Sequence, residues 1–275
     1  MKRGDFGKSA QITVFVIIAI LVIVGGGTGY YFVKNNSGSD NKEFFLREDI
    51  KPTMDNIKSS IITCTEFSAK SSLEKIGIQG GYSSKPEKYF DLGWAFIPYY
   101  YYEGKFMMPE KLIIEKELGK EYETEFLNCF KGINATGFEI KKGSSKTKAS
   151  IGDGQVDFLI DMPVTITKEG NTIKIEMKDA SVTEKSKLSQ IIEIGKYITD
   201  SHEEDPNMIC ITCVADMAEE RDVYVYSFDA NDNSVLMLIM DNRTSSTPYY
   251  FEWLNKYKAS TEAEILAVPA PTSAA

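Results

Sequence analysis

Two cysteines separated by two residues, Cys210 and Cys213, form the stretch of this sequence best suited to chemistry. A thiolate is the nucleophile of thiol–disulfide exchange, and a helix N-terminus lowers the pKa of a cysteine placed there. Redox catalysis of this kind is typical of a strand-to-helix turn in a thioredoxin-like fold, whereas antiparallel patterns surround this pair. We therefore favour a local structural disulfide, with buried free thiols or thiol exchange as the alternatives.

The single histidine, His202, precedes three acidic residues at 203–205 and suggests a cation site. Zinc bound by this imidazole and the two thiols would still need a fourth ligand, and no second Cys-x-x-Cys occurs. Asp153-Gly154 and the segment 229–233 contain oxygen ligands but not the EF-hand spacing, so we interpret both as turns. We expect the acidic residues to lie in solvent at the end of a helix and expect no metal site.

Motifs for other reactions are missing. The sequence contains no Gly-x-Ser-x-Gly and no glycine-rich phosphate loop after a strand, and a lone histidine does not suffice for a histidine-based triad. The net charge of −9 argues against nucleic acid as a partner, because that binding depends on clustered Lys and Arg. We expect no catalytic residue and no cofactor.

The residues 11–33 form an apolar run without a charged side chain. A helix of this length covers roughly 34 Å, enough for the hydrocarbon core of a bilayer. A basic segment, 1–10, precedes the run, and a polar spacer, 34–47, follows it. By the positive-inside rule we expect a cell-membrane protein with a cytoplasmic N-terminus, a transmembrane helix at 11–33 in contact with the lipid bilayer, and an extracytoplasmic main domain.

The segment 8–15, KSAQITVF, resembles the archaeal pilin-type (class III) signal and anchor. That resemblance implies cleavage between Ala10 and Gln11 by a prepilin-type peptidase. Two positions depart from the pattern, because Ala10 replaces the usual Gly, and Phe15 stands where filament-forming archaeal pilins often have Glu. The first departure weakens the case for processing and the second the case for a filament.

A second resemblance covers roughly the first half of the chain and continues more weakly beyond it. This part of the chain is similar to a family of archaeal single-pass surface proteins. The similarity lies in the order of the following residues: Cys64, Gln79-Gly80-Gly81-Tyr82, Ile97-Pro98-Tyr99-Tyr100, Pro109-Glu110 and Cys129. No activity is known for that family. The resemblance implies a location at the cell surface and no catalytic role.

We expect the segment 48–261 to form one extracytoplasmic α+β domain, with a possible sub-boundary near 132–137, and 262–275 to be a disordered tail rich in Pro, Ala and Ser. Helical spacing of apolar residues predicts two amphipathic helices, at 48–77 and after Pro109-Glu110, the second ending at Gly132.

Beyond them, alternating residues predict an antiparallel meander, then a helix near 188–198 and a C-terminal hairpin. The predicted strands of the meander and hairpin are 138–140, 149–151, 156–160, 164–167, 172–177, 223–228 and 235–240, with one further strand at 249–254.

The two predicted amphipathic helices each contain one cysteine on the apolar side, Cys64 and Cys129. Export favours oxidation, so we predict that these two residues form a disulfide. Four cysteines allow three pairings, and two buried free thiols are the alternative. Export would also make the Asn-x-Ser/Thr triplets at Asn35, Asn134 and Asn242 candidate glycosylation sites.

The function expected from these features is that of a membrane-anchored surface protein with a structural or interaction role and no enzymatic activity. Its expected partners are copies of itself or other surface proteins. A pilin-like filament subunit is one alternative, and an extracytoplasmic ligand-binding or thiol-redox module is another.

Overall fold

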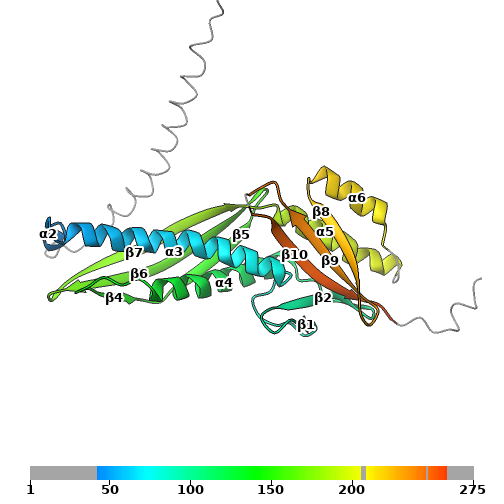
Figure 1. The fold of residues 1–275 in the computed structure, drawn as a ribbon, viewed down its shortest axis with the longest axis horizontal. Helices are drawn as coiled ribbons and strands as arrows, with labels where there is room; N and C mark the ends of the chain where they lie inside the picture. The colour runs from blue at the N-terminus through cyan, green and yellow to red at the C-terminus, as the bar shows by residue number, and fades with distance from the viewer. Residues whose placement is uncertain (1–41, 206–208, 246, 259–275) are drawn as a thin grey trace, which may run out of the picture. The chain divides into compact units, whose positions relative to one another are not determined.

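A computed structural model describes residues 42–205, 209–245 and 247–258 (Figure 1). Its helices and strands are α2 (Lys42–Phe45), α3 (Lys51–Ile78), β1 (Tyr89–Asp91), β2 (Phe96–Tyr102), β3 (Lys105–Phe106), α4 (Lys111–Lys131), β4 (Glu139–Lys142), β5 (Lys146–Ile151), β6 (Gln155–Lys168), β7 (Asn171–Lys185), α5 (Leu188–Glu204), α6 (Ile211–Glu220), β8 (Tyr224–Ala230), β9 (Ser234–Asp241) and β10 (Tyr249–Lys256).

The described residues divide into two compact units. The first comprises 42–61, 132–146 and 160–180, and the second comprises 62–131, 147–159 and the described residues from 181 onwards. Helix α3 and strands β6 and β7 contribute residues to both units. β6 belongs to a four-stranded sheet in which it lies between β4 and β5 and also pairs with β7.

Strand β6 shows why this sheet forms. Its buried and partly exposed residues alternate along the strand, as the period of two requires for a sheet with one covered face. The buried members, all at 0% exposure, are Val156, Phe158, Ile160, Met162, Val164 and Ile166. In the first unit, β4 pairs with β6 in an antiparallel register that places Ile140 opposite Ile166.

The second unit contains a six-stranded sheet in the order β1-β2-β10-β9-β8, with β3 also paired to β2. Figure 1 shows β8, β9 and β10 side by side. β10 is antiparallel to β9 but parallel to β2, with Leu254 opposite Tyr99. The sheet is therefore mixed.

The core of this unit is centred on Trp253 of β10, which is fully buried and stacks on Tyr100 of β2. Helix α5 lies close to this pair, because a Cβ atom added at Gly195 would be 3.7 Å from Trp253 and 3.8 Å from Tyr100. The turn after α3 places Gly80 and Gly81 at positive φ, and the Tyr100 hydroxyl donates a hydrogen bond to the Gly80 carbonyl. Glycine is favoured there because residues with a Cβ rarely adopt that backbone conformation.

The α+β content agrees with the sequence, but two parts of the expected fold class are wrong. Among the residues described here, no helix combines the length and apolar character needed to cross a membrane. The longest, α3, has an exposed face with charged residues that include Asp55, Glu66 and Lys70. The expectation of a single-pass membrane protein with a signal anchor is corrected accordingly, and the run 11–33 on which it depended lies outside the described residues.

The second correction concerns the sheets. A meander would place β4, β5 and β6 in chain order, but the observed order has β6 between β4 and β5. In the other sheet, β2 and β10 come from distant parts of the sequence and pair in parallel, which the sequence did not predict. The physical reason is that alternation within a strand reports which side chains face the core and carries no information about the direction of its neighbour.

Candidate functional site

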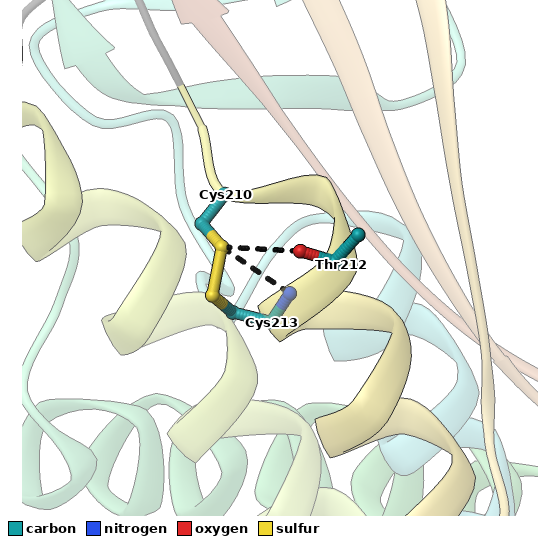
Figure 2. The surroundings of a disulfide bond; sticks show 3 residues. All are labelled: Cys210, Thr212 and Cys213. Carbon is teal, nitrogen blue, oxygen red and sulfur yellow. Dashed lines mark hydrogen bonds between the residues drawn. A yellow bond between two sulfur atoms is a disulfide. The ribbon is translucent and has the colours of Figure 1, made fainter.

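Cys210 and Cys213 form a disulfide at the start of α6, as Figure 2 shows. Cys210 is the N-cap residue of this helix, and its Sγ accepts a hydrogen bond from the backbone N–H of Cys213 at 3.3 Å. The Thr212 hydroxyl lies 3.6 Å from the same sulfur. The N-terminus of α6 therefore directs a backbone donor and a hydroxyl at one sulfur atom.

The two cysteines differ in accessibility. Cys210 is exposed and Cys213 is half-buried, since it lies on the turn that leads to the buried Val214. Between them, Ile211 is 76% exposed. Cys210 is therefore the more accessible residue of the pair.

The surroundings of this disulfide differ from a thioredoxin fold. Helix α5 precedes it and strand β8 follows α6, so the order is helix, helix, strand. The buried face of α6 includes Val214 and Ala218, and α6 is near both α5 and β8. The local features needed for thiol exchange are present here without a parallel strand–helix–strand unit.

The other disulfide joins Cys64 of α3 to Cys129 of α4, with their Cα atoms 5.6 Å apart. Cys64 is buried and Cys129 half-buried. This bridge connects two long helices across a separation of 65 residues. Its position indicates a structural role, which is to hold α3 and α4 together.

A charged cluster links the same two helices. Lys75 of α3 lies 2.5 Å from Glu121 and 3.7 Å from Glu125, both on α4. Burial raises the pKa of the Glu121 carboxyl, although Lys75 opposes that rise. Burial would lower the pKa of Lys75, but its hydrogen bond and attraction to Glu121 outweigh that effect and raise it. The cluster has the character of a structural ion pair.

His202 is 2% exposed and lies among aromatic rings. Its ring centroid is 4.5 Å from that of Tyr101 and 5.4 Å from that of Tyr257, and its Nε2 is 3.3 Å from Asn255 Nδ2. Glu203 on the same helix is exposed. In the described part of the chain, no group of three His, Cys, Asp or Glu residues is arranged to hold a metal ion.

The two segments with calcium-type oxygen ligands are turns. Gly154 has a φ of +73°, its carbonyl accepts a hydrogen bond from the N–H of Ser186, and Asp153 accepts one from Gln190. Asp232 and Asn233, between β8 and β9, also have positive φ. Each segment reverses the chain direction.

Two of the three candidate glycosylation residues, Asn134 and Asn242, are exposed. The third, Asn35, and the proposed processing site at Ala10 and Gln11 lie outside the described residues. A hollow of about 320 Å³ in the first unit is lined by polar and charged side chains together with Pro163. One of its lysines, Lys174, is paired with Glu176, which also lines it.

Sequence reasoning missed an apolar surface on the six-stranded sheet. We call it the outer sheet face, and its members are Tyr224, Tyr226, Phe228, Leu236, Leu238, Met240 and Tyr250, with Glu252 opposite Leu238 on the same side. Directly paired residues in neighbouring strands point to the same side, and the register places Tyr224 opposite Met240 and Met240 opposite Tyr250.

The β8 residues of this face are exposed, reaching 39% at Tyr226 and 50% at Phe228. Their rings stack with centroids 6.2 Å apart. The sequence contained a sign of this face. In Tyr224–Phe228, apolar residues occur on both sides of the alternating strand, whereas a strand with one covered face needs them on one side only.

Comparison of the chain with protein-family models, with curated proteins and with solved structures finds no match. Function must therefore be argued from the geometry of the chain itself.

Proposed function

We propose that this protein is a self-associating structural protein that acts outside the cytoplasm, and that two copies join through edge strand β8 and the outer sheet face. The observation that carries the proposal is the row of exposed aromatic side chains on a strand at the end of its sheet. Contiguous exposed apolar residues of this kind are typical of interaction surfaces.

Strand β8 lies at the edge of its sheet, and α6 is near it. Within the described residues it pairs only with β9, so one side of its backbone has no neighbouring strand. Soluble proteins usually protect such edges with Lys, Pro, a bulge or a covering segment. The sequence of β8, YVYSFDA, contains neither Lys nor Pro. A second strand can add to this edge through main-chain hydrogen bonds.

A second copy fits the edge better than an arbitrary segment because the strand is complementary to itself. In an antiparallel β8–β8 pair with Tyr226 on the two-fold axis, Tyr224 of each copy lies opposite Phe228 of the other. The aromatic rows of both copies then form one continuous surface, as expected for an isologous interface.

The charged groups at the ends of β8 do not carry the proposal. The Arg243 guanidinium lies 3.1 Å from the Tyr224 hydroxyl and near its ring, and it forms an ion pair with Asp222 of the same chain. Asp229 lies at the other end of the strand, and its side chain points to the face opposite that of Phe228, because side chains alternate along a strand. The proposed interface therefore depends on the aromatic side chains and the strand edge.

The disulfides support a location outside the cytoplasm. All four cysteines of the chain are paired in two disulfides. Disulfides persist in oxidising compartments and are rare where cellular thiol systems keep cysteines reduced. The resemblance to archaeal surface proteins stays a prediction from the sequence, and a self-associating surface protein is compatible with it.

Molar mass in solution tests the proposal. The measurement uses the full chain in buffer with mild detergent, so that the apolar run 11–33 does not drive association. Under these conditions we expect the wild-type chain to be a dimer and Tyr226→Lys to be a monomer. Phe67→Lys, an equivalent change of an exposed aromatic residue on α3, should leave the dimer intact. Far-UV circular dichroism of both variants controls for folding. Equal mass for Tyr226→Lys and wild type would reject the interface.

Cross-linking tests the register. Tyr226→Cys should form an interchain disulfide rapidly, because directly opposed residues of an antiparallel pair have Cβ atoms only about 5 Å apart. Phe67→Cys should not form one. A Tyr226→Cys chain that stays monomeric on a non-reducing gel, while wild type is dimeric, would rule out this two-fold axis.

A further inference from the structure

We infer that the Cys210–Cys213 disulfide is an exchange site that accepts two electrons from a dithiol segment of a partner protein. The inference rests on the geometry at the start of α6 and does not depend on self-association through β8. Three features carry it: the accessibility of one sulfur, the donors directed at that sulfur, and the contrast with the other disulfide of the chain.

Accessibility determines where attack occurs. Cys210 is exposed whereas Cys213 is half-buried, so an incoming thiolate reaches Sγ of Cys210 first. Ile211, which is 76% exposed, provides an apolar contact beside the reacting sulfur. A thiol carried on an extended apolar peptide segment can use that contact, so a protein dithiol suits the site better than a small polar thiol.

The donors at the helix N-terminus favour the thiolate that exchange produces. The N–H of Cys213 already points at Sγ of Cys210 at 3.3 Å, and the Thr212 hydroxyl is 3.6 Å away. Once the disulfide is reduced, both groups can donate to a Cys210 thiolate, and the positive end of the α6 dipole adds to their effect. Stabilising the reduced form makes a disulfide a stronger oxidant.

The reaction balances without a further reagent. A thiolate of the partner attacks Sγ of Cys210, which forms a mixed disulfide and breaks the Cys210–Cys213 bond. Cys213 leaves as a thiolate and takes up a proton. The second thiolate of the partner then attacks the partner's first sulfur, which is bonded to Cys210 in the mixed disulfide. This step forms the partner's disulfide and releases Cys210 as a thiolate. Two electrons pass from the partner to this chain.

The Cys64–Cys129 disulfide provides an internal control. It joins two long helices, and Cys64 is buried at 3% exposure. Both cysteines lie within their helices, α3 and α4, and not at a helix N-terminus. An attacking thiolate has poor access to the buried Cys64. The two disulfides of one chain should therefore respond very differently to the same reductant.

Equilibration of the full wild-type chain with mixtures of reduced and oxidised glutathione tests the inference, with alkylation and peptide mapping to count reduced cysteines. We expect Cys210 and Cys213 to become reduced at a glutathione ratio at least tenfold less reducing than that needed for Cys64 and Cys129. Reduction of both disulfides together, or of Cys64–Cys129 first, would overturn the inference.

The pKa of Cys210 tests the thiolate argument separately. In Cys213→Ser, which keeps the backbone N–H at 213, the rate of Cys210 alkylation should reach half its maximum at a pH at least one unit below the free-cysteine value of about 8.5. Adding Thr212→Val should move that midpoint upward, whereas Thr244→Val should not. A midpoint at or above the free-cysteine value would contradict the proposed role.

Trapping tests the order of attack. A synthetic peptide with two cysteines should gain a disulfide when mixed with the oxidised wild-type chain. A peptide with one cysteine, activated as a mixed disulfide with thionitrobenzoate, should become covalently attached to Cys213→Ser with release of thionitrobenzoate, but not to Cys210→Ser. Tyr226→Lys should exchange at the wild-type rate, which separates this inference from the proposed interface. Failure of the wild-type chain to oxidise the peptide would sink the exchange role and leave self-association untouched.

Discussion

The ammonium nitrogen of Lys75 lies 2.5 Å from a carboxylate oxygen of Glu121, and this contact joins the two helices that Cys64 and Cys129 also connect. The Glu121 side chain is 4% exposed, whereas that of Lys75 is 43% exposed. The buried Glu121 carboxylate therefore depends on the Lys75 ammonium to stabilise its charge, whereas solvent can stabilise the charge of Lys75.

Lys75→Met should lower the free energy of unfolding by about 1–2 kcal/mol at pH 7, because it leaves the buried Glu121 carboxylate without its ammonium. The half-exposed position of Lys75 keeps this loss below that of a fully buried pair. Urea unfolding measures it, with Lys116→Met, an exposed lysine on α4, as the matched control. The deficit should shrink as the pH falls and Glu121 takes up a proton. Equal stability of the two variants would refute the dependence.

The two disulfides should contribute unequally to stability. On the chain-entropy estimate, a separation of 65 residues corresponds to about 4 kcal/mol and a separation of 3 residues to about 1.5 kcal/mol. Replacing Cys64 and Cys129 by serine should therefore lower the melting temperature more than replacing Cys210 and Cys213. Calorimetry of the two double variants gives the comparison. A larger loss on replacing Cys210 and Cys213 would contradict the prediction that Cys64–Cys129 is the main structural disulfide.

Glu252 on β10 should make stability depend on pH. Burial raises the pKa of its carboxyl above the reference value of 4.5. The folded state therefore holds this proton more tightly than the unfolded state, so its stabilising effect is complete below the unfolded pKa and is lost as the pH rises through the folded pKa. Glu252→Gln removes the cost of burying the charge.

We expect Glu252→Gln to be more stable than wild type by roughly 1 kcal/mol at pH 7, with the difference disappearing in acid. Urea unfolding across the pH range checks this, with Glu219→Gln on the exposed side of α6 as the control. A gain that persists unchanged in acid would show that the cause is not the carboxyl charge.

Two helical glycines should respond in opposite directions to alanine. A Cβ atom at Gly77 of α3 would lie 2.2 Å from the carbonyl oxygen of Tyr250, whereas one at Gly119 of α4 would meet nothing closer than 3.5 Å. Gly77→Ala should therefore lose about 1–3 kcal/mol through forced backbone movement. Gly119→Ala should be neutral or gain up to about 1 kcal/mol from helix propensity. Thermal melts of both variants distinguish the two, and similar melting temperatures would refute the close contact at Gly77.

The helices and strands with strong local patterns were predictable from the sequence. The apolar spacing that includes Ile57 and Ile61 predicted α3 to within a few residues of its ends, and alternation around the turn at 231–233 predicted β8 and β9. In each case the pattern of side chains reports directly which face is covered.

Features set by distant contacts were not predictable in this way. The parallel alignment of Tyr99 with Leu254 depends on two strands far apart in the sequence, and neither strand contains a sign of its neighbour's direction. Helix α6 is only ten residues long, which is too short for its apolar spacing to separate it from a turn. For His202, the sequence showed its acidic neighbours, but its actual surroundings are Tyr101 and Tyr257.

The pairing of β2 with β10 also constrains how the chain can fold. The central strand of the six-stranded sheet is the last one described, so Tyr100 has no stacking partner until Trp253 has been synthesised. Contacts of such long sequence separation form slowly, and a partly made chain exposes its unpaired strands meanwhile. A nascent chain that ends before Trp253 cannot complete this core, and if the protein is exported, it can do so only after nearly all of the chain has emerged.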